Sequence, residues 1–285
     1  MGRIQSILRP ETIAEAVQLL RQGNGRAAVL AGGTSLAVRS PANVDTLVDI
    51  SALGLHGVAG FDGGLSIKAR TPLAHVAASA AAQQFLDGVI PTACNRVAST
   101  PLRNMITFGG NLFQPLPWSD LPALMLALNA DFVVTQEQTR TISADTLYAP
   151  GARSIVKPGD ILTEVRIPAP PPDSRAVFHK VSRTGFDYAT LDVAVAATMA
   201  GSTIAACRVV LGCVRTLPIR VAAAEEELIG KSPSPQLFAS AAAKAAGSIE
   251  PAHDFRFSQE YRRHLIKVWV RRALHETFGT SEAIR

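Results

Sequence analysis

The pattern of apolar and polar residues near the N-terminus predicts an amphipathic helix over residues 11–22. Four apolar positions recur at helical spacing and so share one face: Ile13, Ala16, Val17 and Leu20. Thr12 stands at the expected N-cap, and Glu15 follows three residues later, as in a capping box. Asn24 and Gly25 are typical of the residues that end a helix, so we expect the chain to turn there.

Short apolar runs bounded by turn residues predict several strands in the first half of the chain. One run stops in the pair Gly32-Gly33, and another follows a sequence that is typical of a hairpin turn, residues 61–64 (FDGG). Longer apolar segments, one of them rich in alanine, predict helices. The expected elements are strands at residues 26–31, 46–49 and 65–69 and helices at residues 73–84 and 121–128.

The proline-rich run at residues 168–172 cannot continue a helix or a central strand, so it predicts a domain boundary. Beyond it, three short strands are expected before a group of helices. These elements are strands at residues 179–181, 194–199 and 204–214 and helices at residues 220–228, 235–247 and 258–278. The sequence therefore predicts an α+β protein with a first domain at residues 1–172 and a second at residues 173–285.

The composition is typical of a compact folded protein, with 47% apolar and 18% charged residues among 285. No apolar run reaches the ~20 residues that a membrane-spanning helix needs. The N-terminus has neither the apolar core nor the small-residue cleavage site of a signal peptide. We therefore expect a protein of the cytoplasm with no membrane span.

The charge balance is mildly basic, at +5, and five basic residues fall in the last expected helix. They are Arg262, Arg263, Lys267, Arg271 and Arg272. Basic residues spaced along a helix more often form a solvated face than a nucleic-acid site, and no interleaved aromatic residues or known motif accompany them. We therefore expect no nucleic-acid partner, whereas an anionic cofactor or an acidic protein surface would suit this charge.

The cysteines exclude several kinds of site. There are three, Cys94, Cys207 and Cys213, and no pair has the spacing CxxC. This set provides no disulfide framework, no zinc site and no four-thiolate iron–sulfur site. We therefore predict no metal ligands in this chain and expect any metal centre to belong to another subunit.

Two glycine-rich segments are the strongest candidates for chemistry. Residues 31–35 (AGGTS) directly follow an expected strand, and residues 107–111 (TFGGN) lie in a separate loop. Paired glycines let the backbone approach a ligand closely, and successive N–H groups then converge on an anion. The Thr and Ser hydroxyls and Asn111 add polar groups. Two such loops would hold a pyrophosphate from both sides without any lysine.

Each glycine pair is weak evidence by itself, because a Gly-Gly pair after a strand is usually an ordinary tight turn. Neither segment matches GxGxxG or GxxxxGK[ST], so a Rossmann crevice and a P-loop are both disfavoured. Ser35 does not lie in a nucleophile elbow, so we expect no hydrolase.

The joint occurrence of the two segments, together with motifs in the second half, resembles the FAD-binding (medium) subunits of molybdenum hydroxylases. Carbon monoxide dehydrogenase has such a subunit, and xanthine dehydrogenase has the corresponding FAD domain. The similarity runs nearly end to end. It includes AGGTSL (31–36), LVDIS (47–51), LRNMITFGGNL (102–112), SDLPALMLALNA (119–130), GDILTEVRIPAP (159–170), HKVSRTGFDYAT (179–190), LGCVRTLPIRVAAAEEELIG (211–230) and EYRRHLIKVWVRRAL (260–274).

This resemblance implies a PCMH-type flavin fold of two α/β subdomains, at about residues 1–55 and 56–172. A C-terminal domain of a small antiparallel sheet with helices is expected to follow. The resemblance also assigns FAD-contacting positions to this chain. They are Leu30, Ala31, Gly32, Gly33, Thr34, Ser35 and Leu36 in the first segment, Thr107, Gly109, Gly110 and Asn111 in the second, and Asp120, Leu162, Lys180 and Tyr188.

Within that set, the resemblance gives different roles to different residues. The glycine segments would bind the pyrophosphate, Asp120 the ribose or adenine end, and Leu162 an apolar part of the nucleotide. Lys180 and Tyr188 would lie near the flavin ring. Without the family, Asp120 would be read as a helix N-cap, Lys180 as a solvated lysine and Tyr188 as a core tyrosine.

One departure from the family pattern falls inside the second glycine segment. Phe108 stands where isoleucine is usual, in a loop expected close to the flavin, so the family pattern does not fix the local ring contacts or the acceptor preference. Some relatives hold an additional iron–sulfur cluster in this subunit, which the cysteine count excludes here.

The resemblance implies an electron-transfer role with no catalytic residue in this chain. Electrons would come from a molybdenum cofactor on a large subunit through two [2Fe–2S] clusters on a small subunit, and FAD would pass them to an external acceptor. A dimer of heterotrimers is the expected assembly. Two other hypotheses remain open: a scaffold subunit with a decayed flavin site, and a self-contained FAD oxidoreductase of the same fold.

Overall fold

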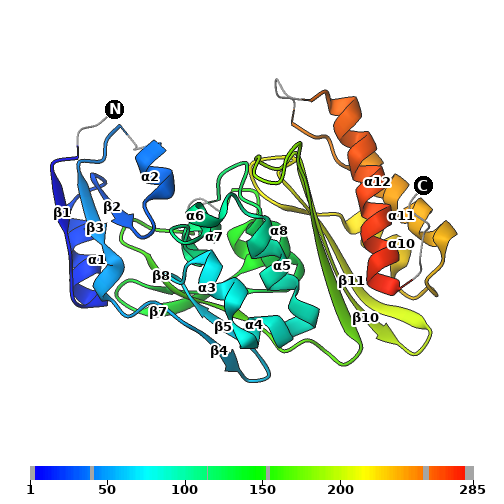
Figure 1. Cartoon of the computed structure of the whole chain (residues 1–285), viewed down its shortest axis with the longest axis horizontal. Helices are drawn as coiled ribbons and strands as arrows, with labels where there is room; N and C mark the ends of the chain where they lie inside the picture. The colour runs from blue at the N-terminus through cyan, green and yellow to red at the C-terminus, as the bar shows by residue number, and fades with distance from the viewer. Residues whose placement is uncertain (1–3, 39–41, 114, 152–154, 253–256, 280–285) are drawn as a thin grey trace.

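Three sheets follow one another along the chain in the computed structural model, which describes residues 4–38, 42–113, 115–151, 155–252 and 257–279. The first sheet is small and parallel, and the other two are antiparallel. In Figure 1 the three units lie side by side, with the first sheet at one end and the last sheet with its helices at the other. The α+β architecture predicted from the sequence is confirmed.

The first unit is a parallel sheet in the order β1-β3-β2. Its elements are β1 (Ser6–Leu8), α1 (Ile13–Gln22), β2 (Ala27–Leu30), α2 (Thr34–Val38), β3 (Thr46–Asp49) and the short 3₁₀ helix η1 (Ile50–Ala52). The predicted cap forms, because the Thr12 hydroxyl accepts a hydrogen bond from the Glu15 N–H at 3.1 Å. The Glu15 carboxylate accepts from the N–H of Glu11 rather than of Thr12, so the capping box is shifted by one residue. Three of the four predicted apolar positions, Ala16, Val17 and Leu20, are buried.

The second unit is an antiparallel sheet in the order β4-β5-β8-β6-β7, with helices packed on it. Its strands are β4 (Val58–Phe61), β5 (Gly64–Lys68), β6 (Asp131–Thr135), β7 (Thr139–Ser143) and β8 (Ile161–Ile167). Its helices are α3 (Leu73–Ala78), α4 (Ala80–Gln84), η2 (Phe85–Gly88), α5 (Val89–Arg96), α6 (Thr100–Arg103), α7 (Phe108–Leu112), α8 (Leu121–Ala127) and α9 (Ala144–Leu147). The hairpin turn predicted at residues 61–64 joins β4 to β5.

The single helix predicted over residues 73–84 is wrong, because the chain breaks it at Ser79. The backbone of Ser79 is extended (φ −71°, ψ 126°), so α3 ends there and α4 starts anew. The side-chain amide of Gln83 donates to the carbonyl of Ala77 at 3.3 Å and satisfies one acceptor at the break. Alanine content indicated helical propensity but carried no signal for this interruption.

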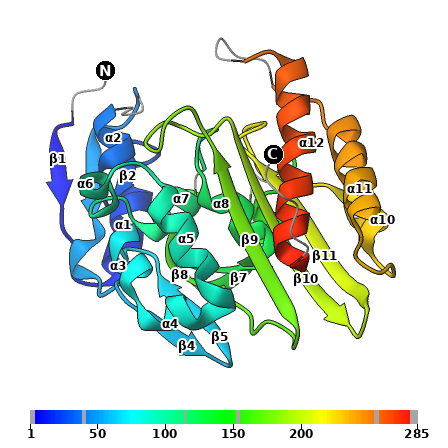
Figure 2. The ribbon, with the colours of Figure 1, turned by 45° about the vertical axis from the view of Figure 1, so that its right-hand side comes forward.

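The C-terminal unit is an antiparallel sheet in the order β12-β11-β10-β9, reached through the proline-rich residues 168–172. Its elements are β9 (Ser174–Val181), β10 (Leu191–Ala200), β11 (Thr203–Gly212), β12 (Ile219–Arg220), α10 (Ala222–Leu228), α11 (Pro235–Ser248) and α12 (Gln259–Phe278). Helices α10, α11 and α12 cover one face of this sheet (Figure 2). Helices α5 and α8 of the second unit pack on its other side.

Side-chain alternation along β10 explains why this sheet joins two cores. Val193 and Val195 belong to the core beneath α10–α12, whereas Ala194 between them belongs to the core of the second unit. Strand side chains point alternately to opposite faces, so one strand supplies both cores. The C-terminal sheet is therefore fixed against the second unit by buried apolar contacts.

The basic residues of α12 do not form a uniformly solvated face, which corrects the expectation from their spacing. Arg262 is buried, and its guanidinium donates to the carbonyls of Thr190 (3.1 Å) and Cys213 (3.2 Å). Arg263, Lys267 and Arg272 are exposed, as expected. No helix in the described parts of the chain is long and apolar enough to cross a bilayer.

Candidate functional site

The first glycine segment forms the sharp turn between β2 and α2. Strand β2 ends at Leu30, and α2 begins at Thr34. Gly33 takes a left-handed backbone conformation (φ +71°), which any residue with a Cβ adopts only with strain. The carbonyl of Gly33 accepts the N–H of Ala37 at 2.9 Å and so starts the short helix.

The second glycine segment begins α7 and is fixed to the strand edge beside it. The Thr107 hydroxyl caps the helix by accepting the N–H of Gly110 at 3.2 Å. The N–H of Gly109 donates to the Ala69 carbonyl at 2.8 Å. A Cβ at Gly109 would lie 2.8 Å from that carbonyl oxygen and 3.0 Å from a methyl of Leu162, so close packing requires glycine.

The two glycine segments meet in space. A Cβ on Gly32 would lie 1.9 Å from the carbonyl oxygen of Met105, two residues before Thr107. Such a distance is impossible for a real side chain, so glycine at this position permits the contact. The structure thus brings together two segments that lie more than seventy residues apart in the sequence.

A cavity of about 230 Å³ lies between these segments. Its lining includes Ala31, Gly32, Arg70, Asn104, Met105 and Thr107. Small-molecule pockets usually enclose ~300–1,000 Å³, so this space suits a fragment such as a pyrophosphate rather than a whole dinucleotide. We call it the glycine cavity.

Arg70 is the residue of this cavity that the sequence analysis missed. Its Nε atom is buried, and its guanidinium forms no hydrogen bond or ion pair with any residue in the described ranges. The sequence analysis expected two loops that hold a pyrophosphate without any lysine, and the structure places an arginine side chain in the lining as well. The sequence did offer one signal for Arg70. It lies two residues after the end of β5, as Gly32 lies two residues after the end of β2.

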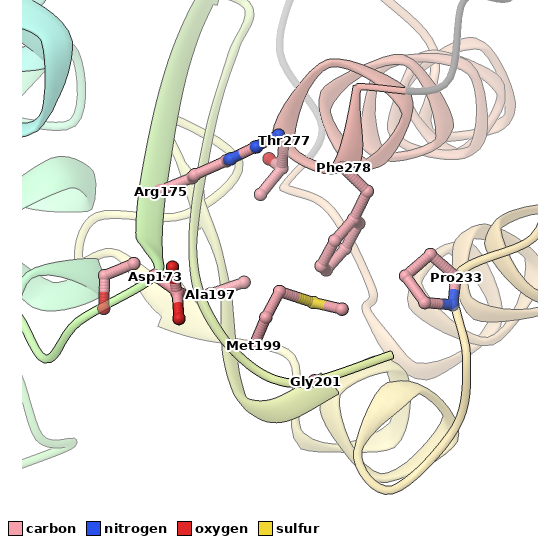
Figure 3. Close-up of a pocket in the computed structure, with 9 residues that line it drawn as sticks. Asp173, Arg175, Ala197, Met199, Gly201, Pro233, Thr277 and Phe278 are labelled. Atoms are coloured by element: carbon pink, nitrogen blue, oxygen red, sulfur yellow. The ribbon is translucent and has the colours of Figure 1, made fainter. Parts of the chain in front are cut away.

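A larger cavity of about 400 Å³ lies in the C-terminal domain (Figure 3). Met199 and Phe278 project into it, and Asp173 and Arg175 line the start of β9. It includes neither glycine segment nor any other predicted FAD-contacting residue. We therefore locate the candidate site at the smaller cavity.

Asp120 and Lys180 lie together where the second unit meets the C-terminal unit. The Lys180 ammonium is 3.3 Å from the Asp120 carboxylate and donates to the Arg96 carbonyl at 3.0 Å. The Asp120 side chain is only 4% exposed and the Lys180 side chain only 3%. Lys180 is therefore not a solvated lysine, and Asp120, which makes no capping hydrogen bond, is not the side-chain cap of α8. Two residues assigned by resemblance to different parts of FAD are direct neighbours.

Asp192 and Cys213 extend this pair into a buried cluster. The Cys213 thiol donates to the Asp192 carboxylate at 3.0 Å, and the ligand atoms of Asp120, Asp192 and Cys213 all lie within 4.8 Å of one another. Burial raises the pKa of Asp120 to about 6, against the opposing attraction of Lys180. Burial and the neighbouring Asp120 raise the pKa of Asp192 well above its usual value. We call Asp120, Lys180, Asp192 and Cys213 the charge cluster.

The charge cluster is suited to holding protons rather than a metal ion. Burial raises the pKa of the Cys213 thiol, and the neighbouring carboxylates raise it further. Metal ligands must be deprotonated, so raised pKa values on Asp192 and Cys213 disfavour a cation there. Lys180 adds a positive charge that would repel one.

Asn111 and Leu162 hold the second glycine segment in place through contacts with neighbouring elements. The side-chain oxygen of Asn111 accepts the N–H of Leu121 at 3.3 Å, so it ties α7 to the start of α8. Leu162 is buried and packs beneath Gly109. Phe108 is fully buried in the same core, so its side chain has no exposed surface to offer a flavin ring.

Tyr188 lies on the surface, which excludes the core role that a tyrosine has by default. It is 59% exposed and packs against Trp118, with ring centroids 5.1 Å apart. Trp118 was not anticipated from the sequence. The pair joins the loop before α8 to the loop between β9 and β10 and presents aromatic surface beside the charge-cluster seam.

Comparison with known proteins agrees with this geometry. A family model described as the FAD binding domain in molybdopterin dehydrogenase matches residues 3–170. A second model, the CO dehydrogenase flavoprotein C-terminal domain, matches residues 176–277. Together they account for most of the chain, glycine segments included.

Individual relatives match over nearly their whole length. The carbon monoxide dehydrogenase medium chain of Afipia carboxidovorans is 32% identical over 274 residues, covering 93% of this chain and 94% of the relative. The glyceraldehyde dehydrogenase medium chain of Sulfolobus acidocaldarius is 30% identical, covering 95% and 97%. A solved carbon monoxide dehydrogenase from Hydrogenophaga pseudoflava superposes with a TM-score of 0.92 at 29% identity, covering 98% of this chain and 99% of that one.

Proposed function

Because the chain belongs to the FAD-binding medium subunits of the molybdenum hydroxylases, we propose that it transfers electrons from a partner's iron–sulfur clusters to an external acceptor. The observation that carries this proposal is the meeting of two glycine segments around one cavity, within a chain that matches this family end to end. Such subunits belong to complexes that also contain large and small chains. We propose a large molybdenum-cofactor subunit, a small subunit with two [2Fe–2S] clusters, and a cytoplasmic dimer of these heterotrimers.

The residues on each side of the glycine cavity fit a pyrophosphate group. Gly32 allows close backbone approach, Gly33 provides the left-handed turn, and the unpartnered Arg70 supplies a positive charge. A side chain at either glycine would fill or distort the space. When bound, FAD supplies the ability to accept electrons singly and release them in pairs, and the protein supplies orientation and charge.

The remaining predicted residues are divided between contact and support. Tyr188 and Trp118 offer aromatic surface for a flavin ring. Asp120 and Lys180 have almost no exposed surface, so we assign them to positioning the seam and setting its electrostatic potential. Leu162 and Asn111 hold the second glycine segment in place.

Native purification with a tag on this chain tests the proposal. We expect the complex to contain one FAD per copy of this chain, together with a large molybdenum-containing subunit and a small iron–sulfur subunit. Reducing the clusters should then bleach the flavin absorbance, and adding the acceptor should restore it. Recovery of this polypeptide by itself, active on an organic substrate, would contradict the proposal and favour a self-contained oxidoreductase.

A matched variant separates electron transfer from substrate oxidation. In a complex that carries Gly32→Val, substrate should still reduce the iron–sulfur clusters, seen by electron paramagnetic resonance, while acceptor reduction is lost. Undiminished acceptor reduction without FAD would mean that electrons leave by another route.

A further inference from the structure

We infer that Arg70 is the charge partner of the FAD pyrophosphate and makes binding at the glycine cavity depend on the diphosphate; this inference rests on the proposed function. Arg70 lines the cavity together with Gly32 from the first segment and Thr107 from the second. The other named lining residues are uncharged. A guanidinium in this position faces a space that both glycine segments shape for an anion.

Arg70 is partly buried, and its guanidinium has no hydrogen-bond or ion-pair partner among the residues that the structure describes. Its Nε atom in particular is buried and unpartnered there. No carboxylate in the described residues forms an ion pair with it, whereas Arg140, Arg166, Arg208 and Arg220 each pair with an acidic side chain. Buried donors are normally hydrogen-bonded, so a buried Nε–H without an acceptor is costly. An anionic ligand in the cavity would supply that acceptor.

The backbone around Arg70 is held firmly against the second glycine segment. The carbonyls of its two neighbours, Ala69 and Thr71, accept the N–H groups of Gly109 and Phe108, both at 2.8 Å. The N–H of Arg70 itself donates to the Leu55 carbonyl at 2.8 Å. The Thr71 hydroxyl bonds both backbone groups of Gly57, at 2.9 and 3.0 Å. The side chain therefore projects from a rigid segment, which lowers the entropy cost of binding.

Arginine suits this role better than lysine because its planar fork donates two parallel hydrogen bonds to phosphate oxygens. Backbone N–H groups of the first glycine segment would orient the same group, because those of Phe108, Gly109 and Gly110 in the second already donate to protein acceptors. Arg70 would supply the neutralising charge. The inference thus adds a side-chain cation to a site for which the sequence indicated only backbone N–H groups and neutral polar side chains.

The test is a fluorescence titration of FAD into deflavinated protein. We expect Arg70→Gln to weaken FAD binding by roughly 10- to 100-fold, the range for losing a charged hydrogen bond. The FAD affinity of Arg70→Lys should fall between those of the parent and of Arg70→Gln. Loss of one cation should also reduce the dependence of FAD affinity on salt concentration. Arg263→Gln, on the exposed face of α12, changes the net charge equally and should bind FAD like the parent.

Riboflavin, which has the ring but no phosphate, separates a charge role from a structural one. We expect riboflavin to bind the parent and Arg70→Gln equally. Unchanged FAD affinity in Arg70→Gln, or an equal loss for FAD and riboflavin, would overturn the inference while leaving FAD binding by the parent intact. Failure of the parent itself to bind FAD would overturn the proposed function as well.

Discussion

The glycine cavity and the charge cluster differ in whether their charged side chains have partners within the protein. At the cavity, Gly32 provides no side chain, and Arg70 lies beside the open space without a hydrogen-bond or ion-pair partner in the described parts of the chain. In the cluster, Asp120 and Lys180 pair with each other, and neither lines the glycine cavity. An unpartnered cation beside a space indicates a ligand, whereas a buried ion pair between β9 and the start of α8 indicates a structural contact between two units. We therefore assign anchoring of FAD to the first region and electrostatic tuning to the second.

The largest expected effect comes from closing the cavity. Gly32→Val places a branched side chain against the Met105 carbonyl. Even a single Cβ at this position would lie 1.9 Å from the carbonyl oxygen, so the two glycine segments must separate. We expect the purified variant to lose its FAD completely. Absorbance of the flavin per protein chain measures this loss.

A matched glycine elsewhere provides the control for Gly32→Val. Gly247 lies on the exposed side of α11, and a Cβ there meets nothing within 4 Å. Gly247→Val should keep a full complement of FAD. Retention of FAD by Gly32→Val at the same level would remove the first glycine segment from the site.

A smaller effect is expected on stability when the charge cluster loses its cation. Lys180→Met leaves Asp120 buried without a partner, which typically costs roughly 3–5 kcal/mol in unfolding free energy. The cost should depend on pH. Burial raises the folded-state pKa of Asp120 to about 6, above its value in the unfolded chain, so the protonated carboxyl stabilises the folded state. This contribution to stability is lost as the pH rises through about 6. Without Lys180 the pKa rises further, so the loss should be greater at about pH 8 than at about pH 5.

Urea unfolding of the single and double variants measures this pH dependence. Asp120→Asn combined with Lys180→Met removes both charges, so its stability should vary less with pH than that of Lys180→Met. A loss in Lys180→Met that is independent of pH would mean that Asp120 does not carry the charge that Lys180 neutralises.

The smallest expected effect is on the flavin potential. Lys180 favours negative charge nearby, but Asp120 offsets much of its field. We expect Lys180→Met to lower the FAD midpoint potential by about 30 mV or less, which for a two-electron couple corresponds to ~1.4 kcal/mol or less. FAD content should stay close to that of the parent. An unchanged potential would show that Lys180 does not act on the flavin, and a rise would contradict the predicted sign of its effect.

The sequence was sufficient for features that depend on neighbouring residues. The Thr12 cap, the hairpin at residues 61–64 and both glycine segments follow from local backbone requirements, and the structure contains each of them. The family resemblance then supplied the reason for considering the two glycine segments together. Local chemistry and resemblance were thus enough to place the backbone part of the site.

The sequence was insufficient where a residue's role depends on distant contacts. Arg70 enters the cavity because its neighbours bond to α7, and Lys180 is buried because Asp120 and Arg96 lie opposite it. The spacing of basic residues predicted a solvated Arg262, but its guanidinium donates to the carbonyls of Thr190 and Cys213. Charge and spacing along the chain do not encode such long-range partners.

The central claim is that the pyrophosphate of FAD lies in the glycine cavity, and a crystal structure of the FAD-loaded chain tests it most directly. We predict phosphate density between Gly32 and Thr107, with the Arg70 guanidinium within hydrogen-bonding distance of a phosphate oxygen. Phosphate density in the C-terminal cavity beside Met199 and Phe278, or any position out of reach of Arg70, would contradict the account.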